Sequence, residues 1–314
     1  MTHILSAKNI IKRYSGHTAL NDVSIDIPEG SVYGLLGPNG AGKTTFIRII
    51  NRITGPDEGE VFFMGQRLRS AHTSQIGYLP EERGLYKKMK VGEQALYLAT
   101  LKGMKQSDAL KSLKHWFEKF GIEKWWDKNV EELSKGMQQK VQFIVTIIHK
   151  PRLLIFDEPF SGFDPINANL LKNEILNLRE EGATVIFSTH NMSSVEELCD
   201  SIALINQSQV VLEGKVRDIK ESYKTNLFEA EMIHYKNNLP FPEGMKLISE
   251  EKEVNITRLK LGLSQGISSN DCISLLLEHG ELRKFHEVLP SMDDIFIEKV
   301  SNTLNKPIHS KNNE

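Results

Sequence analysis

The chain has 314 residues, which is long enough for about two domains of ordinary size. Its 39 Lys and Arg residues nearly balance its 41 Asp and Glu residues, and the formal charge of −2 argues against a protein that coats nucleic acid. A hydrophobic fraction of 39% and a charged fraction of 25% are typical of a folded protein and exclude a disordered chain.

The cysteines and the apolar runs indicate where the protein works. Cys199 and Cys272 make neither a disulfide framework nor a CxxC metal pair, so we expect a reducing compartment. The longest apolar run, Phe143–Ile148, is far shorter than the roughly 18 residues of a membrane span. The N-terminal residues lack the apolar segment behind a basic start that marks a signal peptide. We therefore expect a cytoplasmic protein whose link to a membrane comes through a partner.

Residues 1–65 predict a β-rich start with one helix. Short apolar segments are separated by Pro and Gly residues, which is typical of strands and turns. These segments lie at Ile25, Ile27, Val32–Tyr33 and Val61–Met64. Apolar residues from Phe46 onward recur at helical spacing and predict a helix from about Thr44 to Ile53, with Gly55 ending it.

The middle of the chain changes from helices to alternating elements. Residues 91–150 are rich in helix-forming residues and predict a helical subdomain. After them, buried strands at Leu153–Phe156 and Thr184–Phe187 alternate with helices at Asn167–Glu181 and Ser193–Leu198. Such alternation is typical of a parallel sheet with crossover helices.

The last third predicts a second, smaller domain. A polar stretch at Lys220–Asn226 marks a boundary, so we expect one domain over residues 1–219 and another over 220–302. The second contains strand candidates at 227–233 and 253–261 and helix candidates at 267–279 and 291–302, which favours an α+β fold. Residues 303–314 are expected to form a flexible tail.

The strongest motif is a G-x4-G-K-T loop between a predicted strand, Val32–Leu36, and the first helix. Its glycines let several backbone N–H groups point at one anion, and the helix N-terminus adds the positive end of a dipole. Lys43 is expected to reach the β- and γ-phosphates of a nucleotide, and the Thr44 hydroxyl to bind Mg²⁺. The loop consists of Gly37, Pro38, Asn39, Gly40, Ala41, Gly42, Lys43 and Thr44, followed by Thr45.

Two adjacent acids follow the apolar run Leu153–Phe156. Neighbouring side chains on an extended chain point in opposite directions, so Asp157 and Glu158 can have different roles. Asp157 is expected to hold Mg²⁺ through its water shell. Glu158 is expected to face the γ-phosphate and polarise the attacking water.

A third motif, Leu133–Gln139, contains a Ser-x-Gly at a predicted helix start. Ser134 is a candidate N-cap, and free N–H groups at a helix start also suit an anion. This stretch resembles the signature motif of ATP-binding cassette (ABC) ATPases, and the phosphate loop and the strand ending in Asp157 stand in that family's order and spacing. The resemblance covers residues 1 to about 215. It implies an α/β P-loop fold with a β-rich subdomain, a RecA-like parallel sheet core and a helical subdomain, followed here by the small α+β domain.

The resemblance also implies roles for individual residues. Tyr14 matches the aromatic residue that stacks on adenine, with Ala19 beside it. Ser161–Asp164 matches the D-loop, although Phe163 stands where Leu is common, and His190 matches the histidine that contacts the γ-phosphate. The implied catalytic residues are Lys43, Glu158 and His190, and the implied ATP-binding residues are Tyr14, Ala19, Gly37, Asn39, Gly40, Ala41, Gly42, Lys43, Thr44, Thr45, Ser134, Gly136, Gln138 and Asp164.

One position departs from the family's commonest pattern. The segment Ile76–Tyr86 resembles the Q-loop region, but Glu81 stands where Gln is usual. A carboxylate can also bind Mg²⁺, so the expected metal ligands are Thr44, Asp157 and Glu81. The run Pro80–Gly84, which includes Arg83, resembles the subgroup that serves sodium, drug or antibiotic exporters.

The family mechanism implies partners for this single cassette. Two cassettes pair head to tail, so a second copy or a paralogous cassette is expected, with Ser134 and Gly136 contacting the nucleotide across the dimer and Asp164 linking the two sites. Integral membrane permease subunits are also expected, which would place the chain on the inner face of the cell membrane. Leu85, Tyr86 and Met89 are candidates for lining the cleft that receives a membrane subunit's coupling helix, or else belong to the subdomain core.

Other residues carry weaker signals. The segment 290–300 resembles the end of the accessory domain found in the exporter subgroup, where dimer stabilisation and regulation are both open. Cys272, His279 and His286 are too dispersed for a metal site. Trp116, Trp125 and Trp126 are expected to pack, because no basic run flanks them in the manner of a nucleic-acid platform.

The sequence therefore predicts the ATP-binding and ATP-hydrolysing subunit of an ABC transporter, of the export type. Two alternatives stay open. One is a soluble ABC ATPase acting on ribosomes or DNA, although the chain has neither two cassettes nor a long coiled-coil insertion, and no nucleic acid is expected. The other is an ATP-binding regulator with little hydrolysis, which Glu81 keeps open and which Glu158 and His190 oppose.

Overall fold

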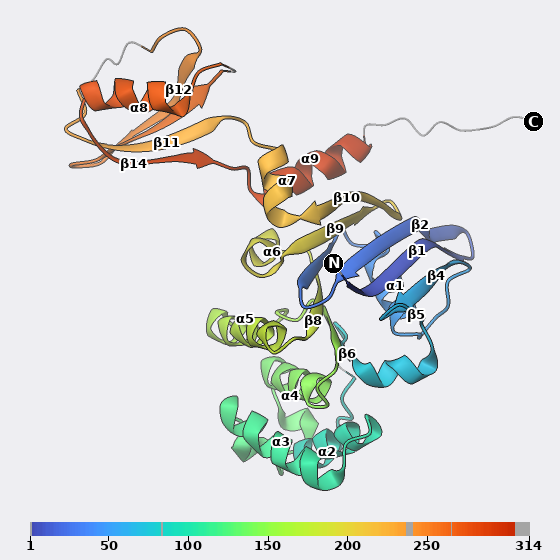
Figure 1. Ribbon diagram of the computed structural model, residues 1–314. Helices are drawn as coiled ribbons and strands as arrows, with labels where there is room; N and C mark the ends of the chain where they lie inside the picture. The colour runs from blue at the N-terminus through green and yellow to red at the C-terminus, as the bar shows by residue number, and fades with distance from the viewer. Residues whose placement is uncertain (1, 83, 237–240, 265, 305–314) are drawn as a thin grey trace, which may run out of the picture. The chain divides into compact units, whose positions relative to one another are not determined.

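The computed structural model describes residues 2–82, 84–236, 241–264 and 266–304, with the side chains of residues 302–304 left out. It contains two compact units, one reaching residue 216 and the other spanning residues 217–302 (Figure 1). Each unit has its own apolar core. Arg83 and residues 305–314, the latter part of the expected tail, lie outside the described residues.

A six-stranded sheet forms the centre of the first unit, with the strand order β10-β9-β3-β8-β7-β6. All neighbours are parallel except β10, which pairs antiparallel with β9. The expected parallel core is therefore confirmed, and its strands are almost entirely buried because helices cover a parallel sheet. The strands are β3 (Val32–Leu36), β6 (Ile76–Leu79), β7 (Leu153–Asp157), β8 (Thr184–Thr189), β9 (Ser201–Asn206) and β10 (Gln209–Lys215).

The β-rich start forms a separate antiparallel sheet with the order β2-β1-β4-β5. Alternate residues of β1 and β2 point into a core shared with the first helix. The two long strands make a hairpin that the sequence analysis did not resolve. The elements are β1 (His3–Tyr14), β2 (His17–Pro28), α1 (Lys43–Ile50), β4 (Glu58–Phe63), β5 (Gln66–Arg67) and the 3₁₀ turn η1 (Ser70–Gln75).

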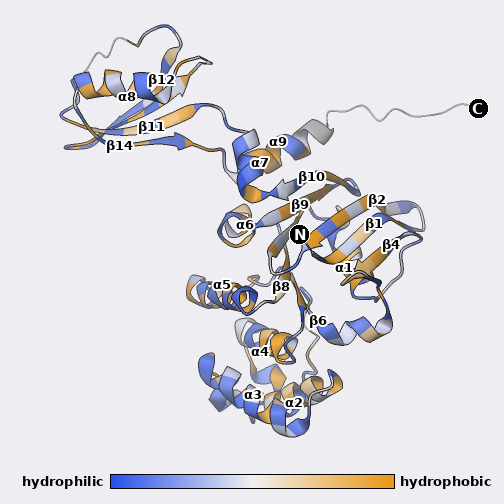
Figure 2. Ribbon diagram, in the orientation of Figure 1, coloured by the Kyte–Doolittle hydropathy of each residue, from blue (hydrophilic) through white to orange (hydrophobic). Residues whose placement is uncertain are grey.

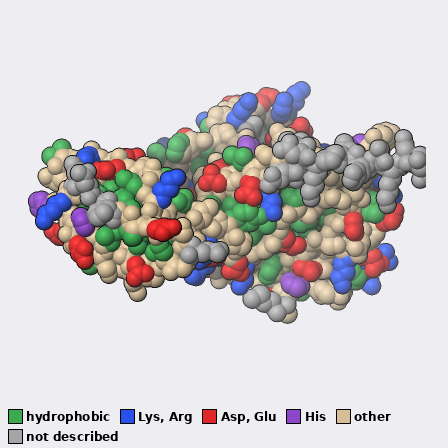
Figure 3. Space-filling view, turned by 90° about the horizontal axis from the view of Figure 1, so that it is seen from above, with side chains coloured by type: hydrophobic (Ala, Val, Ile, Leu, Met, Phe, Trp, Pro, Cys, Tyr) green, Lys and Arg blue, Asp and Glu red, His purple; other side chains and the backbone are tan. Residues whose placement is uncertain are grey.

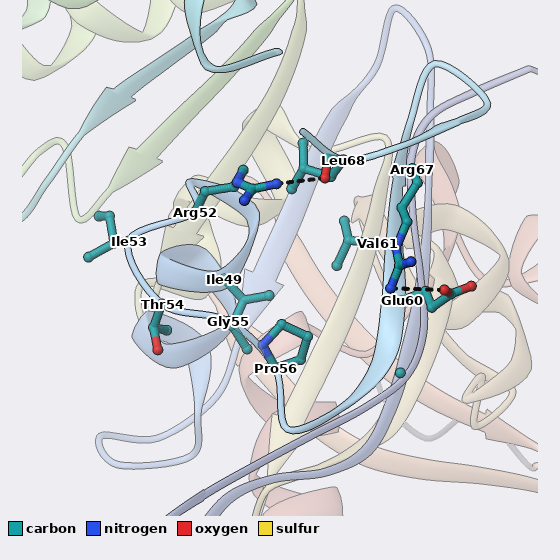
Figure 4. Close-up of a pocket in the computed structure, with 11 residues that line it drawn as sticks. Ile49, Arg52, Ile53, Thr54, Gly55, Pro56, Glu60, Val61, Arg67 and Leu68 are labelled. Atoms are coloured by element: carbon teal, nitrogen blue, oxygen red, sulfur yellow. Dashed lines mark hydrogen bonds and ion pairs between the residues drawn. The ribbon is translucent and has the colours of Figure 1, made fainter. Parts of the chain in front are cut away.

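The end of α1 corrects the sequence prediction. The helix stops at Ile50, not Ile53, and Gly55 does not end it. Arg52 takes a left-handed conformation, and its N–H donates to Ile49 O while Ile53 N–H donates to Arg48 O. Figure 4 shows the Arg52 guanidinium reaching across to donate to Leu68 O at 2.8 Å. This bond explains how an arginine occupies a position that usually takes glycine.

The helical part expected at residues 91–150 is present as three helices and two short turns. Its helices carry both hydrophobic and hydrophilic faces (Figure 2), which is typical of packing on one side only. Trp126 packs against Gly92 and Phe117, as expected for a structural tryptophan. The elements are α2 (Val91–Leu101), α3 (Gln106–Lys119), η2 (Glu123–Trp125), η3 (Val130–Glu132) and α4 (Lys135–Ile147), followed in the core by α5 (Pro165–Glu180) and α6 (Met192–Leu198).

The second unit is an antiparallel sheet with the order β12-β13-β11-β14, and α8 packs against its apolar side chains. The expected α+β character is confirmed, but β12 and β14 were not predicted. The candidate strand 253–261 was placed too early, because Glu253 N–H bonds to Ile256 O in the turn before β13. Thr303 and Leu304, expected in the tail, belong to α9. The elements are α7 (Val216–Ser222), β11 (Leu227–Ile233), β12 (Met245–Lys252), β13 (Thr257–Leu263), α8 (Ser269–Glu278), β14 (Glu281–Val288) and α9 (Met292–Leu304).

An ion pair joins the helical part to the core. Lys119, at the end of α3, lies 2.7 Å from Glu174 of α5, whose side chain is only 4% exposed. Replacing Lys119 by Met leaves the Glu174 carboxylate buried without its cation, which we expect to cost about 3 kcal/mol of stability. Urea unfolding followed by tryptophan fluorescence measures this, because all three tryptophans lie in this part of the chain.

The control is the double variant Lys119→Met with Glu174→Met. It removes both charges and is expected to recover most of the lost stability. A double variant as unstable as the single one would show that Lys119 acts through its packing on Trp116, 4.9 Å from the ring centre, and not through its charge.

Candidate active site

A cavity of about 340 Å³ lies where four parallel strands of the central sheet end. The loop after β3, Glu81 after β6, Asp157 and Glu158 at the end of β7, and His190 after β8 all reach it. Parallel strands end at the same edge of a sheet, so segments far apart in sequence meet there. The lining residues are Tyr14, His17, Ala19, Asn39, Gly40, Ala41, Gly42, Lys43, Thr44, Thr45, Glu81, Asp157, Glu158 and His190.

Two glycines of the loop after β3 are required by its tight path. Gly37 has a φ of 148°, and a Cβ there would lie 2.1 Å from Ile205 O. Gly42 has a φ of 117°, and a Cβ there would lie 2.4 Å from Ala19 O. Any side chain at either position would collide with backbone, which explains the glycines physically.

Lys43 is folded back onto this loop. Its ammonium donates to Gly37 O at 2.6 Å and to Pro38 O at 3.1 Å, and the residue is 8% exposed. Burial lowers the pKa of Lys43, while the nearby carboxylates of Glu158, Asp157 and Glu81 act in the opposite direction. The loop therefore holds a positive charge at the cavity wall.

The two acids at the end of β7 lie differently from the sequence prediction. Asp157 ends the strand, but Glu158 is not extended, because its φ of 48° turns the chain. Both side chains consequently line one cavity. Asp157 is 4% exposed, and burial raises its pKa.

Glu158 and His190 are in direct contact. Glu158 Oε1 lies 2.7 Å from His190 Nδ1 and accepts a hydrogen bond from the His190 backbone N–H at 3.1 Å. Thr189 Oγ1 donates to the other carboxylate oxygen at 3.3 Å. Three groups at the end of β8 thus orient the Glu158 carboxylate in the cavity.

The β1–β2 hairpin supplies the remaining wall. Tyr14 is 46% exposed, and the Lys12 ammonium, itself paired with Asp57 at 2.8 Å, lies 5.5 Å from the ring centre. His17 also lines the cavity and was missed by the sequence analysis. It pairs with Tyr14 across the hairpin, so the strand register was the signal that could have found it.

The signature motif and the D-loop do not line this cavity. Ser134 caps α4 by accepting from Met137 N–H, and Gln138 donates its amide to Leu133 O at 2.9 Å. Asp164 caps α5, and hydrogen bonds from Asn167 lower its pKa. A Cβ at Gly136 would lie 3.5 Å from Gly162 O, so these two motifs lie against each other.

Comparison with known proteins identifies the family. A family model described as ABC transporter matches residues 20–161. The ABC transporter ATP-binding protein YhaQ of Bacillus subtilis is 43% identical over 298 residues, covering 95% of this chain and 98% of YhaQ. The chain belongs to the ABC transporter ATP-binding protein family. The family, the fold and the ATPase activity expected from the sequence are thereby confirmed.

Further comparisons agree with this assignment. The lantibiotic transport ATP-binding protein SrtF of Streptococcus pyogenes is 35% identical over 210 residues, covering 67% of this chain and 90% of SrtF. A solved structure of the ATP-binding subunit of an ABC transporter matches with a TM-score of 0.66 at 30% identity, covering 70% of this chain and 93% of that one.

The family assignment establishes the activity. This chain is the ATP-binding subunit of an ABC transporter, and its cassette is an ATPase domain. Residues 214–300 match the C-terminal domain of DrrA1-3-like ATP-binding proteins, which is the second unit of the structure. None of the helices in the described ranges is long and apolar enough to cross a membrane.

The loop glycines provide a matched test of ATP binding. Gly42→Ala combines a positive φ with a backbone collision and is expected to weaken ATP binding roughly hundredfold or more, about 3 kcal/mol. Gly40 has a φ of 79° but nothing within 4 Å of its Cβ position, so Gly40→Ala should cost only about 1 kcal/mol. Titration with a fluorescent ATP analogue compares the two. Equal losses of ATP affinity in the two variants would show that the positive φ alone, and not the backbone collision, makes glycine necessary in the loop.

Proposed function

We propose that this ABC ATPase hydrolyses ATP in the cavity at the strand ends and so drives export through separate membrane subunits. The observation that supports this most is the convergence of four strand ends on one cavity containing a cationic loop and three carboxylates. Phosphoryl transfer requires a cation that contacts the phosphates. It also requires a group that positions or activates the attacking water, which a nearby carboxylate can do.

ATP binding is assigned to the loop and the hairpin. The loop at the start of α1 lines the cavity; backbone N–H groups at a helix start suit phosphates, and Lys43 would neutralise their charge. Lys43 must leave its carbonyl partners to reach the β- and γ-phosphates. Tyr14, half exposed and packed from one side by Lys12, offers a ring face to adenine beside Ala19.

The residues present fit a magnesium ion. Thr44, Asp157 and Glu81 bring hydroxyl and carboxylate oxygens to the cavity, and Mg²⁺ prefers oxygen ligands. Among the described residues, no group of three or more His, Cys, Asp or Glu side chains could enclose a metal. The ion would be held by oxygens of Thr44, Asp157 and Glu81 together with phosphates and water, and it would neutralise phosphate charge.

Hydrolysis is assigned to Glu158 as general base. Its carboxylate lies in the cavity wall, oriented by His190 and Thr189, and can accept a proton from the attacking water. His190 is well exposed at the cavity, so it can hold Glu158 in place and contact the γ-phosphate.

Closure of the site is assigned to a second cassette. Ser134, Gly136 and Gln138 lie outside the cavity of their own chain, at the free N-terminus of α4, where backbone N–H groups suit a phosphate. Head-to-tail pairing with a second copy or a paralogous cassette would bring them to the nucleotide, with Asp164 at the junction.

Cassettes of this family work with membrane subunits, and we assign the docking site to a groove between β6 and the helical part. Leu85 lines this groove as expected, but Tyr86 and Met89 are not among its lining residues. Docking there would hold the chain on the inner face of the cell membrane. Export as the direction is supported by the likeness to the lantibiotic transport protein and by the DrrA1-3-like second unit.

The surface charge gives no specific support to the alternative of an ABC ATPase that acts on ribosomes or DNA. Basic and acidic side chains are interspersed on the face drawn in Figure 3, whereas a protein that follows a phosphate backbone gathers its basic residues. Purification of the tagged chain from membranes in mild detergent tests this choice. A polytopic membrane protein in stoichiometric amount is expected, and RNA or DNA alone would contradict the transporter assignment.

Glu158→Gln is the sharpest test of the mechanism. It keeps the shape of the side chain but cannot accept a proton, so ATP hydrolysis should fall roughly 10²- to 10⁴-fold while ATP binding is retained. The ATP-bound dimer should then live long enough to be seen by gel filtration. Glu82→Gln is the matched control, because Glu82 is exposed and is not among the residues lining the cavity. Normal hydrolysis by Glu158→Gln would exclude Glu158 as the base.

Glu81→Gln tests the unusual residue after β6. Removing one of three carboxylates from the cavity should change the Mg²⁺ concentration needed for half-maximal ATPase activity more than it changes ATP affinity. A magnesium titration at saturating ATP measures the effect. If neither quantity changes, Glu81 lies outside the metal shell.

A further inference from the structure

The groove assigned to the membrane subunit is a cavity of about 520 Å³. Apolar side chains from three elements form much of its wall, including Leu98 and Leu101 of α2 and Val145 of α4. Leu101 is 63% exposed, so this end of the groove presents a large apolar side chain to the solvent. An apolar wall of this kind suits an amphipathic helix.

Among the described residues that line the groove, Lys102 carries a positive charge without an ion-pair partner. The Lys102 ammonium donates to the backbone carbonyls of Thr73 at 3.2 Å and Ile76 at 3.1 Å. It forms no ion pair with a carboxylate of the described residues. Burial lowers the pKa of Lys102, which is the signature of a charge that has lost water without gaining a counterion.

The other titratable groups of the groove do not balance this charge. His149 lies beside Lys102, and burial together with the Lys102 charge lowers its pKa to about 4, so the ring is neutral at neutral pH. Tyr78 is also neutral, because burial raises its pKa to about 12. The described lining contains neither Asp nor Glu.

Two lining residues, Gln142 and His149, have buried polar atoms without a hydrogen-bond partner among the described residues. Gln142 of α4 is 4% exposed, and its Oε1 accepts no hydrogen bond from any of the described residues. A buried acceptor left unpaired costs about 1–3 kcal/mol, so such groups normally have a partner. Because this oxygen is fully buried, a docked segment could bond to it only if the Gln142 side chain turned toward the groove.

We infer that the membrane-subunit segment occupying this groove carries an acidic side chain, which pairs with Lys102. This inference rests on the proposed function and specifies the chemistry of the partner. Apolar contacts with Leu98, Leu101 and Val145 would bury the segment. The Lys102 pair would fix its register, because a desolvated charge tolerates only an oppositely charged neighbour.

Photocrosslinking identifies the segment. The photoreactive residue p-benzoylphenylalanine replaces Leu101 at the groove rim, and the tagged chain is irradiated in membranes, purified and mapped by peptide mass spectrometry. The crosslinked segment is expected to contain an Asp or Glu within one helical turn of the crosslinked residue. A segment with no acid there would overturn the inference.

Charge reversal tests the pair itself. Lys102→Glu should reduce the retention of the membrane subunit by about tenfold or more, and Lys102→Met by less. Changing the partner's acid to Lys should restore retention with Lys102→Glu and with no other variant. Lys105→Glu is the matched control, because Lys105 is exposed three residues further on and is not in the groove lining. Thermal unfolding of each variant checks that it is folded.

The outcomes separate the inference from the proposed function. A wild-type chain that brings down no membrane protein contradicts both. A membrane subunit that is retained equally by the wild type, Lys102→Met and Lys102→Glu contradicts only the acidic pair and leaves the transporter assignment standing. Retention by the wild type that is lost with Lys102→Glu and restored when the partner's acid is changed to Lys supports both, whereas a loss that this change does not restore contradicts the acidic pair.

Discussion

The parallel pairing of β6, β7, β8 and β3 is the constraint on which the rest of the structure depends. Parallel strands end at one edge, and each of these four strands ends in a residue or loop of the cavity proposed to bind ATP. The register places Leu79 opposite Phe156, and Asp157 opposite Ser188, so Glu81, Asp157 and His190 emerge side by side. No local propensity could bring together residues about 80 positions apart. The buried apolar runs of the strands do so.

The electrostatics of the cavity follow from this convergence. Three carboxylates outnumber the single buried ammonium of Lys43, which their charges help to keep protonated against the effect of burial. A triphosphate entering such a site meets repulsion from Glu81, Asp157 and Glu158 unless a divalent cation accompanies it. By the same argument, the proposed Mg²⁺ ion would be needed for binding as well as for hydrolysis.

Much of the fold could be predicted, because its strongest signals are local. The buried strands before the phosphate loop and before Asp157 are short apolar runs bounded by turn-forming or polar residues. Ser134 caps α4, as its sequence position indicates. Three features could not be predicted, because they depend on distant atoms. Arg52 ends α1 with help from Leu68 O, Glu158 leaves the strand by a positive φ, and His17 reaches the cavity through its pairing with Tyr14. In the second unit, β12 was missed because most of it is exposed and charged, without the apolar alternation that marks a strand.

The strand β6 connects the groove proposed for the partner with the cavity proposed for ATP hydrolysis. At its start, Ile76 O holds the Lys102 ammonium in the groove, and Tyr78 lines the same groove two residues later. Only Leu79 and Pro80 then separate Tyr78 from Glu81 in the ATP cavity. β6 is paired along its whole length with β7, which carries Asp157. A shift at the Ile76 end of β6 is therefore resisted by the same β6–β7 hydrogen bonds that position the Leu79 end. A segment that pulled Lys102 away from Ile76 O would therefore act on the strand pair that leads to Glu81 and Asp157.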